Sequence, residues 1–85
     1  MGDKIRHIRE RFPDQKHSID LLIAEDPEFL DLCEDHQACV NALRYWTESN
    51  APEANNRVNE YRLLVRELEA EITQALSAVK QRWLD

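Results

Sequence analysis

Three residues of this chain, Cys33, His36 and Cys39, have side chains and a spacing suited to metal chemistry. If they lie on one helix, each neighbouring pair is one turn apart and could share a metal ion. The two cysteines, however, point ~240° apart around the helix axis, whereas zinc needs four converging ligands. We therefore predict no metal and no other cofactor, and interpret all three as packing residues. A ligand- or metal-binding helical bundle centred on them is the alternative.

His36 also falls in register with the apolar positions Phe29, Leu32 and Leu43. A histidine on a buried stripe needs a partner for each ring nitrogen, such as a facing carboxylate or a carbonyl. We interpret His36 as a core histidine that fixes the register of the helices, with a ligand or pH-switch role as the alternative. Replacing it with leucine should keep the fold and change how stability depends on pH.

Motifs for catalysis or phosphate binding are not found in the sequence. The serines at positions 18, 49 and 77 have no nucleophile motif around them, and carboxylates this abundant on helices are usually solvated. The only glycine is Gly2, so no Gly-rich loop is available to wrap a phosphate or a dinucleotide. We predict that the protein is not an enzyme.

The beginning of the chain mixes basic and apolar side chains. Residues 1–17 carry five basic and three acidic side chains. Residues 4–11 could contact an RNA backbone or a membrane surface, but Asp3 and Glu10 dilute their positive charge. We predict that residues 1–12 form a flexible basic segment and that the protein binds no membrane. Weak nucleic-acid binding through residues 4–11 is the alternative, and whether the protein has a small-molecule ligand is left open.

The middle of the chain is acidic. Eleven Lys and Arg against seventeen Asp and Glu give a net charge of −6, and residues 18–56 carry nine acidic side chains against one basic. We interpret this as a solvated face that maintains solubility, with docking to a basic partner as the alternative. The longest apolar run, residues 21–24, is far shorter than the ~20 residues that span a bilayer. Two thiols that cannot pair with each other suit a reducing compartment, so the predicted location is cytoplasmic.

Prolines beside capping residues mark where helices should begin. Asp26 can accept hydrogen bonds from the first free N–H groups, and Pro27 fits the first helical position. Asn50 and Glu53 have capping-box spacing around Pro52. Together with apolar residues at threes and fours, these signals predict helices over 14–25, 27–48 and 52–84, in one domain that spans 13–85. Because tight β-hairpin turns need glycine, we predict an all-α fold.

The third predicted helix carries an apolar stripe in strict 3-4 spacing, which is the coiled-coil period. Its short connection to the second helix predicts a long antiparallel helical hairpin. The second predicted helix is shorter than the third. We expect the helix over 14–25, the short N-terminal helix of this fold, to continue the line of the second helix along the third. The alternative, that it folds back, is left open.

One helix–helix seam leaves the flanking apolar residues exposed, so we predict self-association into a homodimer or a larger helical bundle. The aromatic residues near the loop are interpreted as a cluster that closes the bundle, or alternatively as a partner surface. The predicted interface comprises Tyr45, Trp46, Val58, Tyr61, Val65, Leu68, Ile72, Leu76, Val79 and Trp83.

Several of these residues also form a recognisable pattern. The pattern consists of Phe12-Pro13, then Asp26-Pro27-x-Phe29-x2-Leu32-x3-His36, then Tyr61-x2-Leu64 and Leu68-Glu69-Ala70-Glu71-Ile72. It resembles the YdcH-like family of small bacterial proteins over roughly residues 11–76. The family tends to have Lys-Asp-Glu where this chain has Glu69-Ala70-Glu71, and an aliphatic residue at the position of Cys39. The resemblance implies a helical hairpin of unknown function without known catalytic residues. We predict a non-enzymatic interaction or adaptor module that binds itself or another protein by coiled-coil packing.

Overall fold

A computed structural model describes the backbone over residues 3–84 and the side chains over residues 5–82. The described chain forms four α-helices, one short 3-10 helix and no strand: α1 (Asp3–Arg11), η1 (Pro13–Gln15), α2 (Lys16–Glu25), α3 (Pro27–Thr47) and α4 (Ala54–Leu84). The prediction of an all-α protein is therefore confirmed. The 31-residue α4 has a length of ~46 Å at 1.5 Å per residue, which is nearly the 52 Å long axis of the molecule.

The start of α3 follows the expected capping pattern. The Oδ1 atom of Asp26 accepts a hydrogen bond from the backbone N–H of Glu28 at 3.0 Å, and Pro27 occupies the first turn. The backbone N–H of Asp26 in turn donates to the carbonyl oxygen of Leu22 at 2.7 Å and closes α2. Asp26 itself is extended, with φ −133° and ψ 101°, so the chain changes direction between the two helices.

The connection between α3 and α4 differs from the expected capping box. The backbone N–H of Ala54 donates to the carbonyl oxygen of Ala51 at 3.0 Å, which closes a turn around Pro52. The hydroxyl of Ser49 accepts from the N–H of Ala51 at 3.1 Å. A proline φ suits the second position of such a turn as well as the first position of a helix, and here α4 begins two residues later than expected.

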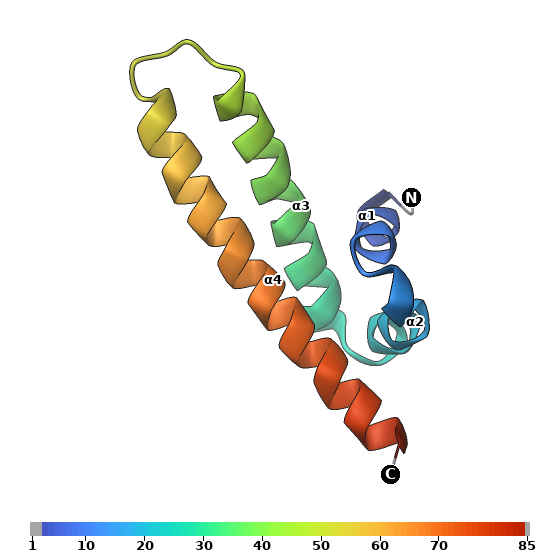
Figure 1. Ribbon diagram of the computed structural model, residues 1–85. Coiled ribbons are helices and arrows are strands. Elements are labelled where there is room, and N and C mark those ends of the chain that lie inside the picture. Colours follow the sequence, from blue (N-terminus) through green and yellow to red (C-terminus); the bar gives the residue numbers. More distant parts are fainter. Residues whose placement is uncertain (1–2, 85) are drawn as a thin grey trace.

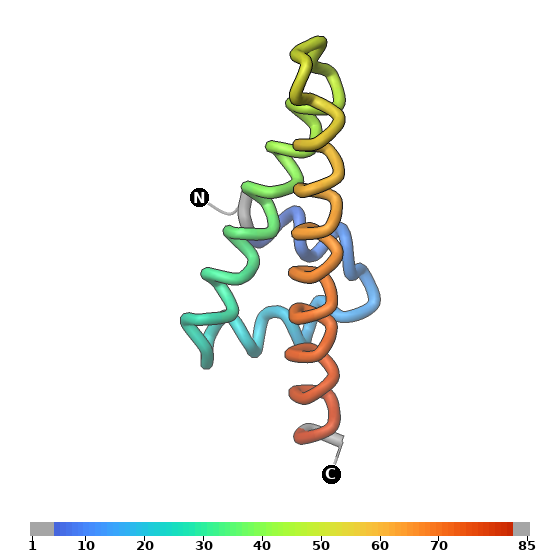
Figure 2. The backbone as a smooth tube through the Cα atoms, turned by 90° about the vertical axis from the view of Figure 1, so that its left-hand side faces the viewer, coloured from blue at the N-terminus to red at the C-terminus, as the bar shows by residue number. Residues whose placement is uncertain are grey.

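The helices α3 and α4 lie side by side and run in opposite directions, and α4 continues beyond the start of α3 (Figure 1). The pair α1 and α2 lies together on one side of them. Figure 2 shows that both short helices run across α4 rather than along it, and α2 contacts both α3 and α4. We expected the helix over 14–25 to continue the line of α3 along α4. This was wrong, because the extended backbone at Asp26 turns α2 away from that line.

Within the described residues, Asp3–Arg11 form a helix, which differs from the flexible segment expected over residues 1–12; residues 1 and 2 lie outside the described part of the chain. This helix, α1, packs against α3 and α2. Ile8 is fully buried, and Phe12 is partly buried against the same core. Ile5, Ile8 and Phe12 recur at threes and fours, which is the spacing of an amphipathic helix and the signal that the sequence interpretation underused.

The apolar core lies where the short helices meet α3 and α4, away from the connection over residues 48–53. It consists of Ile8, Ile19, Leu22, Phe29, Cys33, Ile72, Leu76 and Val79. Towards the connection the molecule is only two helices thick, and large apolar side chains there stay accessible: Tyr45 is 64% exposed, Leu63 54% and Leu64 42%. Within the described residues, no helix is both long and apolar enough to cross a bilayer.

Candidate functional site

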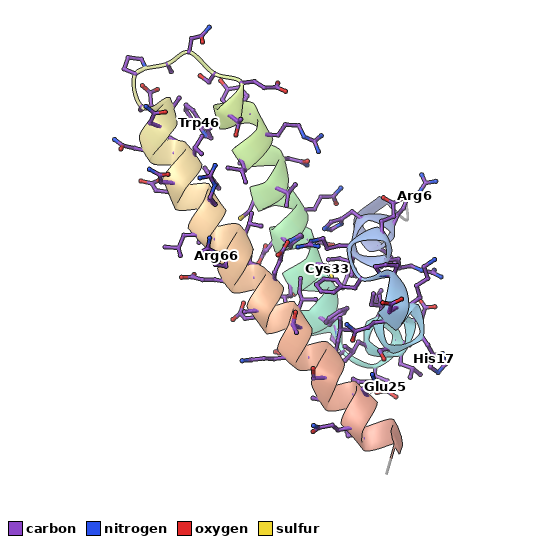
Figure 3. All side chains as sticks on the ribbon, viewed as in Figure 1. Arg6, His17, Glu25, Cys33, Trp46 and Arg66 are labelled. Atoms are coloured by element: carbon purple, nitrogen blue, oxygen red, sulfur yellow. The ribbon has the colours of Figure 1, made fainter. Side chains whose placement is uncertain are left out.

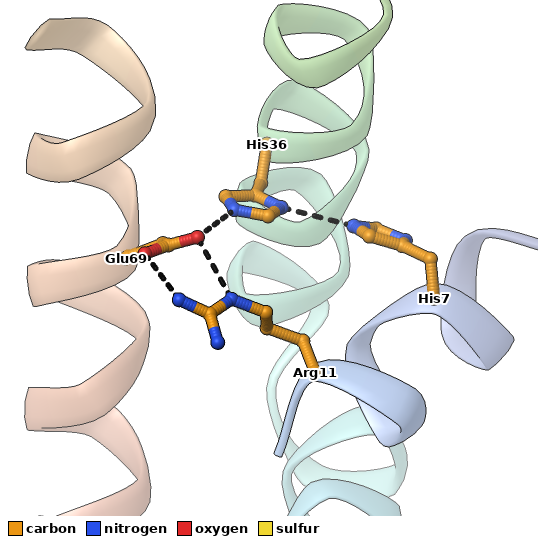
Figure 4. Close-up of polar contacts among 4 residues, drawn as sticks. All are labelled: His7, Arg11, His36 and Glu69. Carbon is orange, nitrogen blue, oxygen red and sulfur yellow. Dashed lines mark hydrogen bonds and ion pairs between the residues drawn. The ribbon is translucent and has the colours of Figure 1, made fainter. Parts of the chain in front are cut away.

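A polar cluster lies at the point where α1 crosses α3. His7 and Arg11 come from α1, His36 from α3 and Glu69 from α4 (Figure 4). The guanidinium of Arg11 donates two hydrogen bonds to the carboxylate of Glu69, both 3.1 Å long. The Nε2 atom of His36 lies 3.0 Å from Oε2 of the same carboxylate. The cluster thus links three helices through one carboxylate.

The two histidines meet by their edges. The Nε2 atom of His7 lies 3.0 Å from Nδ1 of His36, while the ring centroids are 5.2 Å apart and the ring planes differ by 12°. Because the planes are nearly parallel and the centroids lie much farther apart than the two nitrogens, the rings meet edge to edge through these nitrogens rather than face to face (Figure 4). His36 is only 2% exposed. The expectation of a buried histidine with a partner at each ring nitrogen is confirmed.

The charge on Glu69 decides where the protons lie. Its pKa is held below the usual carboxyl value chiefly by the hydrogen bond from Arg11, helped by His36 and opposed by burial. The same contact raises the pKa of Arg11. An ionised carboxylate can only accept, so Nε2 of His36 carries a hydrogen. When His36 is neutral, its Nδ1 must accept from the Nε2–H of His7.

Only one hydrogen can lie between Nε2 of His7 and Nδ1 of His36. If both imidazoles became cationic, an N–H would face an N–H across 3.0 Å, and the contact would become repulsive. A hollow of about 430 Å³ adjoins the cluster and is lined by Glu10 and Val40 in addition to the four cluster residues. Because both nitrogens of His36 are already engaged within the chain, the geometry suits holding α1 in place better than binding a substrate.

The chain was compared with protein-family models, curated proteins and solved structures, and none of them matches it. The role of the cluster and of the surrounding surfaces therefore has to be judged from their own geometry.

The three candidate metal ligands do not converge. Cys33 is fully buried in the apolar core, on the part of α3 that faces α1 and α2 (Figure 3). Burial, with a contribution from the charge of Glu34, raises the pKa of its thiol to about 11. Cys39 is half-buried on the other flank of α3. Among the described residues, no three His, Cys, Asp or Glu side chains are grouped so that they could hold a metal ion.

The predicted interface residues divide into three groups. Ile72, Leu76 and Val79 are buried inside the chain itself, which corrects their assignment because they offer no surface to a partner. The residues of the stripe nearer the connection are partly buried between α3 and α4; they are Val58, Tyr61, Val65 and Leu68.

The third group is aromatic. Tyr45 contacts Trp46 edge to face, with centroids 5.1 Å apart, and Trp46 lies near the connection (Figure 3). Tyr45 is largely exposed and Trp46 only in part. The side chain of Trp83 lies outside the described residues.

The basic residues of the N-terminal segment face carboxylates of the same chain. Arg6 lies 3.7 Å from Glu10, and Arg9 lies 3.6 Å from Asp20. Arg11 is engaged by the carboxylate of the polar cluster. Exposed pairs of this kind contribute little stability, but they compensate the positive charge locally. Nucleic-acid binding through residues 4–11 therefore finds no support in the described side chains, while the side chain of residue 4 lies outside them.

The sequence analysis considered His7 only as part of the stretch over residues 4–11 and Glu69 only as part of the family pattern, and it gave neither residue a role beside His36. Glu69 is 33 positions from His36 and 58 from Arg11 along the chain, so no local spacing connects them. The available signal was the i,i+4 pair of His7 and Arg11, which places both side chains on one face of a helix.

Proposed function

We propose that this chain is a small, non-enzymatic protein-interaction module. In this proposal α3 and α4 act as a helical hairpin that packs against partner helices, supplied by a second copy of the chain or by another protein. The observation that carries the proposal is the exposure of Tyr45, Leu63 and Leu64 on the two-helix part of the molecule, where no third helix covers them. Large apolar side chains left exposed in one part of a protein are a feature of surfaces that bind other proteins.

The apolar spacing of α4 supports coiled-coil packing as the binding mode. Val58, Tyr61 and Val65 follow the 3-4 spacing and are only partly buried. A helix pair with partly buried seam residues gains stability when further helices cover it, at roughly 25 cal/mol for each Å² of apolar surface removed from water. Self-association is the simplest source of such helices.

Two further parts of the proposal depend on the sequence. The resemblance to the YdcH-like family of small bacterial proteins is compatible with a hairpin module of this kind. A cytoplasmic location is supported by the thiols of Cys33 and Cys39, both of which are free, since unpaired cysteines are typical of reducing compartments.

The experiment combines a solution mass with capture from a cell extract. The purified chain is analysed by sedimentation equilibrium, and an immobilised chain is used to capture proteins that are then purified and rebound. The double variant Leu63→Glu/Leu64→Glu should weaken self-association or rebinding by about tenfold or more, because two charges enter an apolar contact. The matched control, Asn55→Glu/Gln81→Glu, adds the same charge at exposed positions of α4 and should change neither. A strict monomer whose captured proteins bind the Leu63→Glu/Leu64→Glu variant equally well contradicts the proposal.

A further inference from the structure

A groove runs between α3 and α4, separate from the polar cluster. It consists of a hollow of about 590 Å³ and a second hollow of about 260 Å³, and both are lined by Glu71. Its apolar lining includes half-buried Leu32, Cys39 and Leu68, exposed Leu64 and, in the second hollow, buried Phe29. None of the residues that line either hollow belongs to α1 or α2. The two short helices therefore leave this groove open.

The rim of the groove is acidic. Its lining residues include five carboxylates and no lysine or arginine: Asp35, Glu67 and Glu71 in the first hollow, with Asp26 and Glu28 added by the second. Within the described residues, none of these five carboxylates forms an ion pair. The arginine–carboxylate pairs of the described chain all lie elsewhere: Arg6–Glu10, Arg9–Asp20, Arg11–Glu69, Arg57–Glu60 and Arg82–Glu25.

The unpaired acidic rim distinguishes between two possible occupants of the groove, a second copy of this chain and a basic helix of another protein. In a symmetric dimer formed through the groove, the same surface would face itself. Glu67 and Glu71 of one copy would then lie against acidic side chains of the other, and like charges brought together at an interface oppose binding. A helix with an apolar stripe flanked by lysine or arginine would cover the apolar lining and also neutralise the rim.

We infer that the groove binds an amphipathic α-helix of another protein whose apolar stripe is flanked by Lys or Arg. The inference rests on the proposed function and adds the chemistry of the partner. From Leu64 to Ala75 the groove follows ~17 Å of α4, which is about three turns of a partner helix. Helix-in-groove recognition of this kind uses apolar anchors at i, i+3, i+4 and i+7, and here the acidic rim sets the preferred charge of the helix.

Two synthetic peptides test the inference. Both carry one leucine stripe at helical spacing, flanked in the first peptide by lysines and in the second by glutamates. Binding of each labelled peptide to the full chain is measured by fluorescence anisotropy at low and at high salt. The lysine peptide should bind about tenfold more tightly than the glutamate peptide at low salt, and salt should reduce this preference.

A charge variant of the rim supplies the second arm. Glu67→Gln/Glu71→Gln should weaken binding of the lysine peptide by about fivefold, as expected for two exposed ion pairs. The control Asp14→Asn/Glu53→Gln removes the same charge at exposed positions outside the groove and should leave binding unchanged. Helicity of all variants is checked by circular dichroism.

The inference is overturned if the lysine peptide does not bind, if the glutamate peptide binds equally well, or if the rim and control variants behave alike. It is also overturned if Glu67→Gln/Glu71→Gln weakens self-association of the chain, because the rim carboxylates would then serve a contact with a second copy rather than with a basic helix. The proposed function fails independently, through the Leu63→Glu/Leu64→Glu experiment. If that variant loses its partner while the rim variant keeps it, the interaction module stands and the basic-helix assignment falls.

Discussion

Replacing Glu69 with alanine should destabilise the protein more than its partly exposed position suggests. The carboxylate is 26% exposed, and Arg11 is 57% exposed, so losing their ion pair should cost about 0.5–1 kcal/mol. His36, at 2% exposure, would keep a buried Nε2–H without its acceptor, which should cost a further 1–3 kcal/mol or so. The expected loss is about 1.5–4 kcal/mol, a large part of the roughly 4–13 kcal/mol that a domain of this size has.

A double variant separates the cost of the unpaired N–H of His36 from the cost of the lost ion pair. In Glu69→Ala/His36→Leu, the buried N–H is removed together with its acceptor, and an apolar side chain takes its place. Because an unsatisfied buried donor costs more than a missing hydrogen bond, the double variant should be more stable than Glu69→Ala alone, by about 1 kcal/mol. The fold should be retained in both.

The assay is urea unfolding at neutral pH, followed by far-ultraviolet circular dichroism, with the slope against urea checked for constancy. Glu71→Ala is the matched control, since it removes an exposed carboxylate two positions away and should change stability by less than about 0.5 kcal/mol. A Glu69→Ala effect as small as the control's, or a double variant no more stable than Glu69→Ala, would refute the assignment of His36 as a donor to Glu69.

Further outcomes follow from the same structure. The folded pKa of Glu69 lies below its ordinary value of 4.5, so its contribution to the free energy of unfolding is complete above that pH and is lost as the pH falls through the folded pKa. Acid unfolding should therefore depend less on pH in Glu69→Gln than in the wild type, and parallel curves of stability against pH would contradict this. In thiol labelling of the native protein followed by mass spectrometry, half-buried Cys39 should react first, and buried Cys33, whose thiol pKa is raised to about 11, should react only on opening of the core; equal rates would argue against the described packing. Ile8→Ala should cost about 2–4 kcal/mol in urea unfolding, whereas a flexible N-terminal segment would show almost no change.

Much of the secondary structure was predictable because its causes are local. The start of α3 follows from Asp26 and Pro27, whose roles need only the next few residues of the chain. The all-α class follows from apolar residues at threes and fours and from the lack of glycine after Gly2. Even the burial of His36 could be predicted, because its position in the apolar stripe specifies the face on which it lies.

The candidate site depended on contacts between distant parts of the chain. The apolar pattern in and just after α1 consists of only three residues, Ile5, Ile8 and Phe12. Only the packing of Ile8 into the core shows that this segment belongs to the fold. Helical periodicity places a side chain on a face but does not state which other helix that face meets. The choice of Glu69 as the partner of His36, like the placement of Arg11 beside it, therefore depends on how α1 crosses the α3–α4 pair. The open acidic groove has the same origin: it exists because the extended backbone at Asp26 directs the short helices elsewhere.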